Sequence, residues 1–230
     1  MGQTDSLVGF GDRPLQLRLP GARRGTKRDA TRRALLESAL NVFGEKGYHR
    51  AAVDEIVTRA GRSKGTAYFH FPSKEAIFRA LVRELASYLV ERVERELVDE
   101  PTAIHRLDAA LLSVIDIFTK HRTLARVTLV EVAGAGRAFS DDLLFVRQQF
   151  AALIRRHLDA AVAEGTLEPC DTDLIATAWF GAISEIVVRW LHDPDHGPLH
   201  MTYPALRHLL LQSVGIDINQ LPADRMPAHA

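Results

Sequence analysis

The chain has 230 residues, of which 47% are hydrophobic and 25% are charged, and its formal net charge is zero. This composition is typical of a soluble globular protein with one or two domains. Apolar runs are short and interrupted by charges, so we expect no membrane-spanning helix, and the first residues lack the basic-then-apolar pattern of a signal peptide. The single cysteine, Cys170, excludes an internal disulfide and fits a reducing cytoplasm.

Charge is distributed unevenly along the chain. Residues 1–80 carry a formal charge of +7, whereas residues 81–230 carry −7. This asymmetry is typical of a protein with a polyanion-binding end, although a solvated basic surface has the same signature.

Residues 1–26 combine Gly, Pro and Arg without a helical period, which predicts a mobile basic arm. The basic residues in and just after this arm are Arg23, Arg24, Lys27 and Arg28. They could contact DNA, and a solvated arm without DNA contacts explains their presence equally well.

Residues 29–93 predict four consecutive helices. Apolar residues recur at helical spacing from residue 29 until Gly47, a natural helix stop. A second, short helix carries Val53 to Ala60 and ends at Gly61. A third begins near Ser63, a favourable N-cap, and ends before Pro72. Ser73 can cap a fourth helix, whose apolar stripe continues to Val93.

The segment "AGRSKGTAYFHFPSKE", residues 60–75, carries the densest chemistry. Gly61 tolerates the positive φ of a tight turn, so the second and third helices form a helix-turn-helix. The first turn of the third helix, from Ser63 to Thr66, presents side chains and free backbone N–H groups that suit phosphates and base edges. Ala67 and Phe71 should anchor the helix on its neighbours. The outward side chains that we expect to contact DNA are Ser63, Lys64, Thr66, Tyr68, Phe69 and His70, with Gly65 allowing a close approach.

The remainder, from Pro101 onward, is also predicted to be helical, because no segment alternates with a period of two. Aromatic residues on these helices are candidates for lining a pocket, although plain core packing explains each of them. The candidate ligand-binding residues are Phe118, Phe145, Gln149, Phe150, Trp179, Phe180 and Ile183. An apolar or aromatic ligand would suit them. Residues 216–230 are expected to form a loose tail.

Two motifs that could indicate other chemistry are better explained as loops. "HDPDHGPLH", residues 192–200, is rich in His and Asp, but Gly197 and Pro198 separate His196 from His200 and make helical zinc geometry improbable. "GAGRAF", residues 134–139, lacks the ending of a phosphate-binding loop. No triad, Cys–His pair or carboxylate pair can be argued. We therefore predict neither a metal site nor a cofactor, and a protein that is not an enzyme.

Residues 29–80 resemble the DNA-binding domain of TetR-family transcriptional regulators. The resemblance is carried by "ALNVFGEKGY", "VDEIVTRAG", "SKGTAYFHF" and "SKEAIF". It implies an all-α protein with a three-helix helix-turn-helix domain at 27–80 and a larger ligand-binding and dimerisation domain at 81–215. It also implies a cytoplasmic homodimer, usually a repressor, that a small effector releases from a palindromic operator. A DNA-binding dimer without an effector is the alternative.

The resemblance also implies roles for individual residues. It adds Lys74 to the DNA contacts given above, and Arg62 is a further candidate because the family often has an apolar residue there; a solvated charge is equally plausible. Ala52 stands where the family often has a capping Thr, so that phosphate contact is in doubt. The dimer interface is expected on the last two long helices, at Ile186, Val187, Trp190, Leu206, Leu209 and Leu210. The helix beginning at Ser73 should carry the ligand signal to the DNA-binding domain.

Overall fold

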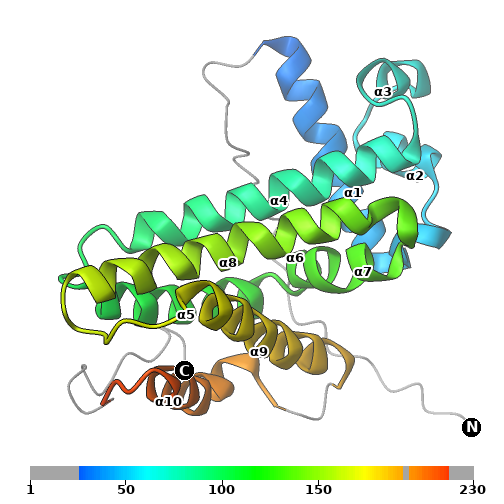
Figure 1. Cartoon of the computed structure of the whole chain (residues 1–230). Helices are drawn as coiled ribbons and strands as arrows, with labels where there is room; N and C mark the ends of the chain where they lie inside the picture. Colours follow the sequence, from blue (N-terminus) through cyan, green and yellow to red (C-terminus); the bar gives the residue numbers. More distant parts are fainter. Residues whose placement is uncertain (1–25, 194–196, 218–230) are drawn as a thin grey trace, which may run out of the picture.

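The computed structural model describes residues 26–193 and 197–217, and every regular element in these ranges is helical, as predicted. The expectations for Arg23, Arg24, His196 and the tail from residue 218 onward lie outside the described residues. The head consists of three helices at the upper right of Figure 1. They are α1 (Lys27–Arg50), α2 (Val53–Arg59) and α3 (Lys64–His70).

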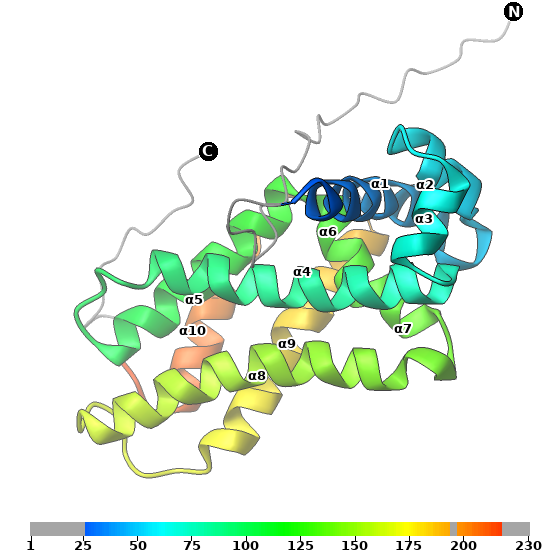
Figure 2. The same cartoon turned by 90° about the horizontal axis from the view of Figure 1, so that it is seen from above.

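The body begins with α4 (Lys74–Glu96), which packs lengthwise on α8 (Ser140–Ala163) (Figure 1, Figure 2). Between them the chain forms α5 (Ala103–Lys120), α6 (Arg122–Ala125), the π-helix η1 (Arg126–Glu131), α7 (Val132–Gly134) and the 3-10 turn η2 (Arg137–Phe139). The last elements are α9 (Thr172–His192), the 3-10 turn η4 (Leu199–Thr202) and α10 (Tyr203–Ser213). They lie on the side of the body away from α3 (Figure 1).

Local signals explain where the helices of the head begin and end. Gly47 interrupts α1 with a φ of 78°, and Gly61 makes the α2–α3 turn with a φ of 60°, so both predicted breaks are confirmed. The hydroxyls of Ser63 and Ser73 accept hydrogen bonds from the backbone N–H groups of Thr66 and Ala76, which caps α3 and α4. Ala52 precedes α2 without a side-chain cap, as the sequence indicated.

The head and the body share one hydrophobic core. Phe43 of α1 meets Phe78 of α4 edge to face, with ring centroids 5.0 Å apart. Phe78 in turn meets Phe139 of η2 at 5.1 Å, and Tyr48 lies 4.9 Å from Phe139. Phe43 and Phe78 are completely buried. The boundary predicted between residues 80 and 81 falls inside α4, so a continuous helix and a continuous core connect the two parts.

Candidate nucleic-acid interface and ligand pocket

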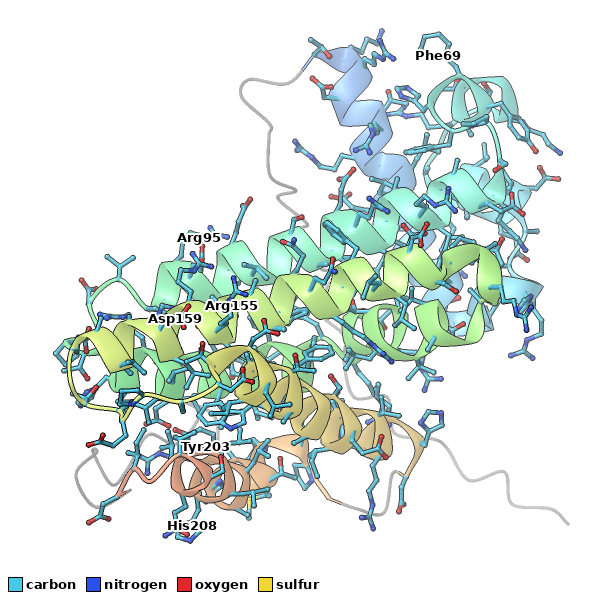
Figure 3. The ribbon with its side chains drawn as sticks, viewed as in Figure 1. Phe69, Arg95, Arg155, Asp159, Tyr203 and His208 are labelled. Atoms are coloured by element: carbon cyan, nitrogen blue, oxygen red, sulfur yellow. The ribbon has the colours of Figure 1, made fainter. Side chains whose placement is uncertain are left out.

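The third helix presents an exposed face at the tip of the head. Ala67 and Phe71 are 1% and 4% exposed and anchor α3, as predicted. Tyr68 is 44% exposed and Phe69 is 70% exposed, and Phe69 points away from the body (Figure 3). Exposed aromatic rings of this size are unusual on a free surface, and here they adjoin the predicted DNA-contact residues of the first turn. A Cβ added to Gly65 would meet no protein atom within 4 Å, so the open space there faces outward.

Basic side chains from α1 surround this face. The guanidinium of Arg28 lies 5.3 Å from the centroid of the Phe69 ring, and that of Arg32 lies 5.4 Å from the Phe71 ring. Burial, together with the positive charges of Arg28 and Arg32, holds the pKa of His70 below its ordinary value. Arg62 is exposed just before α3. The start of α1 and the whole of α3 therefore form one positively charged surface that suits a phosphate backbone.

Two of the predicted DNA-contact lysines have partners within the protein. The ammonium of Lys64 lies 2.8 Å from Oδ1 of Asp54 on α2, and this hydrogen-bonded ion pair raises the pKa of Lys64. Both side chains are more than half exposed, so Lys64 can exchange this partner for a phosphate.

Lys74 is placed differently from Lys64. Its ammonium donates to the backbone carbonyls of Tyr48, His49 and Ala51, at 3.0, 3.2 and 3.2 Å. These bonds use the three donors of an ammonium group and close the C-terminal end of α1. A phosphate contact by Lys74 stays a prediction that this geometry does not favour, since it would break these bonds.

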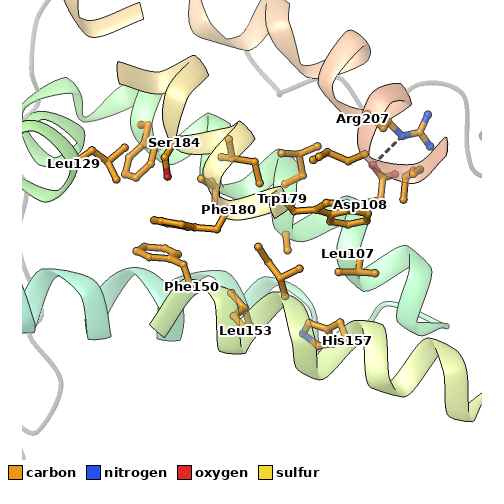
Figure 4. A pocket seen from close by; sticks show the side chains of 18 residues that line it. Leu107, Asp108, Leu129, Phe150, Leu153, His157, Trp179, Phe180, Ser184 and Arg207 are labelled. Atoms are coloured by element: carbon orange, nitrogen blue, oxygen red, sulfur yellow. Dashed lines mark hydrogen bonds and ion pairs between the residues drawn. The ribbon is translucent and has the colours of Figure 1, made fainter. Parts of the chain in front are cut away.

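The body contains an apolar cavity of about 60 Å³ between α5, α8, α9 and α10 (Figure 4). Of the predicted pocket residues, Phe118, Phe150, Trp179, Phe180 and Ile183 do line it. The rings of Phe150 and Phe180 stack across it with their centroids 5.8 Å apart.

Phe145 and Gln149 are not among the residues that line this cavity. Gln149 precedes Phe150 by one residue, and one residue turns a helix by about 100°, so its side chain leaves α8 on another face. Phe145 lies in the same direction as Gln149, and its ring is 5.0 Å from the guanidinium of Arg83 on α4. Ligand contacts by Phe145 and Gln149 stay predictions that this cavity does not favour, because of the phase of α8.

One end of the cavity is polar, and the sequence analysis missed it. Oδ1 of Asp108 accepts hydrogen bonds from the Tyr203 hydroxyl at 2.6 Å and from Nε of Arg207 at 2.8 Å. Asp108 is 2% exposed and Arg207 is 6% exposed. His157 lies at the same end (Figure 4), and burial, reinforced by Arg156 and Arg106, lowers its pKa. An Asp within the apolar stripe of α5 was the available sequence signal.

A second, open hollow of about 550 Å³ lies beside the cavity, between η1, α8 and α9. Leu129, Phe180 and Ser184 line both spaces, so these three side chains form the wall that separates them. Leu129 belongs to η1, and Figure 4 places it with Ser184 at the end opposite Asp108.

The outward face of α9 and α10 only partly matches the predicted dimer interface. Val187, Leu206 and Leu210 are 0%, 5% and 4% exposed within one protomer, and Leu210 lines the cavity, so they belong to the inward face. Leu209 is 60% exposed, and Ile186 and Trp190 are half-buried. The two faces of α10 are visible in Figure 3, where Tyr203 points into the body and His208 points away.

By length and composition α9 could cross a membrane, contrary to the expectation that the apolar runs are too short for this. Only 22% of its most apolar stretch is buried within the protomer. The same exposed apolar surface is what an interface between two copies of a chain requires. Among the described residues, no group of three or more His, Cys, Asp or Glu side chains could hold a metal ion.

Comparisons with known proteins agree with this architecture. Residues 35–81 match the family described as bacterial regulatory proteins, tetR family, and residues 100–202 match the tetracyclin repressor-like C-terminal domain. The fatty acid metabolism regulator protein of Bacillus subtilis is 26% identical over 181 residues, which is 78% of this chain and 93% of that protein. The transcriptional regulator TtgR of Pseudomonas putida is 29% identical over 185 residues, covering 75% and 86%.

Solved structures show the same fold. FadR from Bacillus subtilis, in complex with stearoyl-CoA, superposes with a TM-score of 0.72 at 24% identity, over 79% of this chain and 97% of that one. FadR from Bacillus halodurans gives a TM-score of 0.74 at 22% identity, over 81% and 97%. With both family models matched and the helix-turn-helix and helical body in place, the chain belongs to the TetR family of DNA-binding bacterial transcriptional regulators.

Proposed function

We propose that the protein is a cytoplasmic repressor that binds a palindromic operator as a homodimer and is released by a small, mainly apolar effector. The observation that carries the proposal is the cavity itself, whose wall includes η1, a segment that also contacts α1 of the head. A ligand that displaces this wall acts directly on the DNA-binding domain. This arrangement favours a ligand-responsive regulator over a DNA-binding dimer without an effector.

On DNA, α3 of each protomer enters the major groove. Lys64, Tyr68, His70 and the arginines of α1 supply phosphate contacts, and Phe69 is placed to meet a thymine methyl. A dimer formed through the exposed apolar face of α9 and α10 presents two such helices, and successive major grooves lie about 34–36 Å apart. Effector binding favours a dimer whose heads no longer match this spacing, which is a shift between two populated states.

The chemistry of the effector is suggested by the cavity and by the relatives. The lining is almost entirely aliphatic and aromatic, which suits an elongated hydrocarbon. A relative is a fatty acid metabolism regulator, and a solved structure with this fold is in complex with stearoyl-CoA. A molecule with a long apolar chain is therefore the effector class that we propose.

DNA binding is tested by fluorescence anisotropy with a fragment from the protein's own promoter region and with a scrambled fragment. We expect sequence-dependent binding that weakens as salt rises. Lys64→Ala should weaken it and leave the helical circular dichroism unchanged. Lys120→Ala is the matched control, because Lys120 is also ion-paired, with Asp116 at 2.7 Å, but lies in the body. Equal binding to both fragments, at every salt concentration, would contradict the proposal.

A further inference from the structure

The buried carboxylate of Asp108 has one oxygen that no group among the described residues satisfies. Oδ1 accepts from Tyr203 and Arg207, whereas Oδ2 is buried and has no hydrogen-bond partner. The side chain is 1% exposed, so bulk water does not reach it. An acceptor oxygen in such a place is normally paired, because its burial without a partner is costly. Asp108 lines the apolar cavity, so a molecule in the cavity can supply the missing donor.

A second unpaired polar atom lies at the same end of the cavity. Nε2 of His157 on α8 is buried and has no hydrogen-bond partner within residues 26–193 and 197–217. Asp108 and His157 both lie at the end away from Leu129 and Ser184 (Figure 4). The remaining lining is apolar except for Ser184 and Arg207. A ligand with one polar end and a long apolar remainder matches this division.

The charges at this end select among possible polar groups. Asp108 and Arg207 form a buried ion pair, with 2.8 Å between Oδ1 and Nε, and together they are neutral. A carboxylate beside Oδ2 would place two like charges together, and it offers no donor. A cation would add an unbalanced charge to a largely apolar space. An uncharged hydroxyl or amide N–H provides the donor without either cost.

We infer that the cavity takes an uncharged, elongated apolar ligand whose hydroxyl or amide N–H end donates to Oδ2 of Asp108, with Nε2 of His157 as a second polar anchor. This rests on the proposed function, and it specifies the polar end of the effector. The apolar tail points toward Leu129 and Phe180. Because the cavity of about 60 Å³ is smaller than the roughly 300–1,000 Å³ of common ligand sites, the tail displaces this wall into the adjacent hollow.

The test compares four probes that share a ten-carbon chain: decan-1-ol, decanamide, methyl decanoate and decanoate. Binding to the full-length protein is measured by calorimetry at neutral pH. The alcohol and the amide should bind at least about tenfold more tightly than the ester and the carboxylate, because only they donate to Asp108. This ranking needs no variant. His157→Leu should weaken binding of the alcohol.

Asp108→Asn gives a sharper result than a simple loss. Tyr203 and Arg207 both donate to the first oxygen, so the Asn amide must place its NH₂ group where Oδ2 was. The pocket then offers a donor, so methyl decanoate should bind the variant more tightly than it binds the wild-type protein. Decan-1-ol, whose hydroxyl can also accept, should lose its advantage over the ester. A purely structural role for Asp108 would not strengthen binding of the ester. Asp142→Asn is the control, since Asp142 is an equally buried carboxylate, 1% exposed, that pairs with Arg79 and Arg83 outside the cavity.

The outcomes separate the two proposals. Equal affinities for the four probes, tightest binding of decanoate, or no binding of any probe would overturn the inference about the polar end. The proposed function survives any of these results if another long-chain molecule, such as stearoyl-CoA, releases the operator. It fails by itself if the protein shows no sequence-dependent DNA binding, whatever the probe ranking.

Discussion

The carboxylate of Glu131 accepts a hydrogen bond from the backbone N–H of Tyr48, with 3.0 Å between Oε2 and N. Glu131 ends η1 in the body, and Tyr48 belongs to the last turn of α1 in the head. Gly47 has a φ of 78°, and a Cβ there would lie 3.1 Å from Glu131 Oε2. The positive φ therefore favours glycine here, and a Cβ would push the carboxylate of Glu131 by a few tenths of an ångström. The body holds the head here as well as through α4, the link predicted from the sequence.

Loss of the Glu131 contact should uncouple the head from the ligand cavity. Glu131→Ala removes the acceptor and leaves α3 untouched, so operator affinity without effector should change little, while release by effector becomes weaker. Stability should fall by about 1–2 kcal/mol, because the Tyr48 N–H loses a charged acceptor. The measurement is operator affinity with and without saturating effector. Glu131→Gln keeps an acceptor oxygen and should retain most of the effect of effector on operator affinity. An equal effect in the Ala and Gln variants would show that the hydrogen bond to Tyr48 does not connect the cavity to the head.

A cap added to α2 should stabilise the head. Ala52 makes no side-chain hydrogen bond to the start of this helix. Ala52→Thr supplies the hydroxyl and should raise the free energy of unfolding by ~1 kcal/mol, as measured by urea denaturation. Ala52→Val has the same branched shape without the hydroxyl and serves as the control. Equal stability of the Thr and Val variants would show that no cap forms.

Removal of the Asp54 carboxylate should strengthen DNA binding. In the free protein Asp54 pairs with Lys64 at 2.8 Å, and this bond must break before Lys64 contacts a phosphate. Asp54→Asn frees the ammonium of Lys64 and removes a negative charge from the DNA-facing surface. Operator affinity at low salt should therefore rise by roughly several-fold. Asp116→Asn, which frees Lys120 in the body, is the matched control. Unchanged affinity in the Asp54 variant would place Lys64 outside the interface.

Stability should fall as the pH drops below the ordinary histidine range. Burial lowers the pKa of His157 from 6.5, so the unfolded chain takes up its proton first as the pH falls. The stabilisation is present above about pH 6.5 and is lost as the pH falls toward the lowered pKa. His157→Phe should flatten this slope in urea denaturation between about pH 5.5 and 7.5. Part of the dependence of stability on pH should remain in this variant, because the pKa of His70 is also lowered. Parallel curves for both proteins would contradict the assignment.

Two partly buried carboxylates change the stability in the opposite direction as the pH falls. Burial raises the pKa of Glu37 and of Glu84 above 4.5, so their contribution to stability declines as the pH rises through that region. Their slope of stability against pH has the opposite sign to that of the histidines, and this difference in sign separates the two effects.

Local sequence features predicted the head well, because they act over one or two turns. Gly61 supplies the positive φ, Ser63 and Ser73 cap their helices, and Ala52 leaves its helix without a cap. The candidate pocket was predicted only in part. Phe150 and Phe180 face the cavity, whereas Phe145 leaves α8 in another direction, and apolar character alone did not resolve helix phase.

Contacts between distant segments were not readable from the sequence. Asp108 and Arg207 are 99 positions apart, and Tyr48 and Glu131 are 83 apart. Each pair depends on how α5 meets α10 or how η1 meets α1, which no periodicity encodes. The inward orientation of Val187 and Leu210, predicted as interface residues, likewise depends on packing between helices.

The central claim is that a ligand in the apolar cavity controls DNA binding by the head. Its most direct test is operator affinity, measured by fluorescence anisotropy while decan-1-ol or stearoyl-CoA is titrated into the protein–operator complex. The titration is carried out with the wild-type protein and with Phe180→Trp, whose larger side chain occupies the cavity. The account predicts that at least one ligand releases the wild-type protein from its operator and that the filled variant stays bound. Full operator affinity at saturating concentrations of ligands that calorimetry shows to be bound would contradict it.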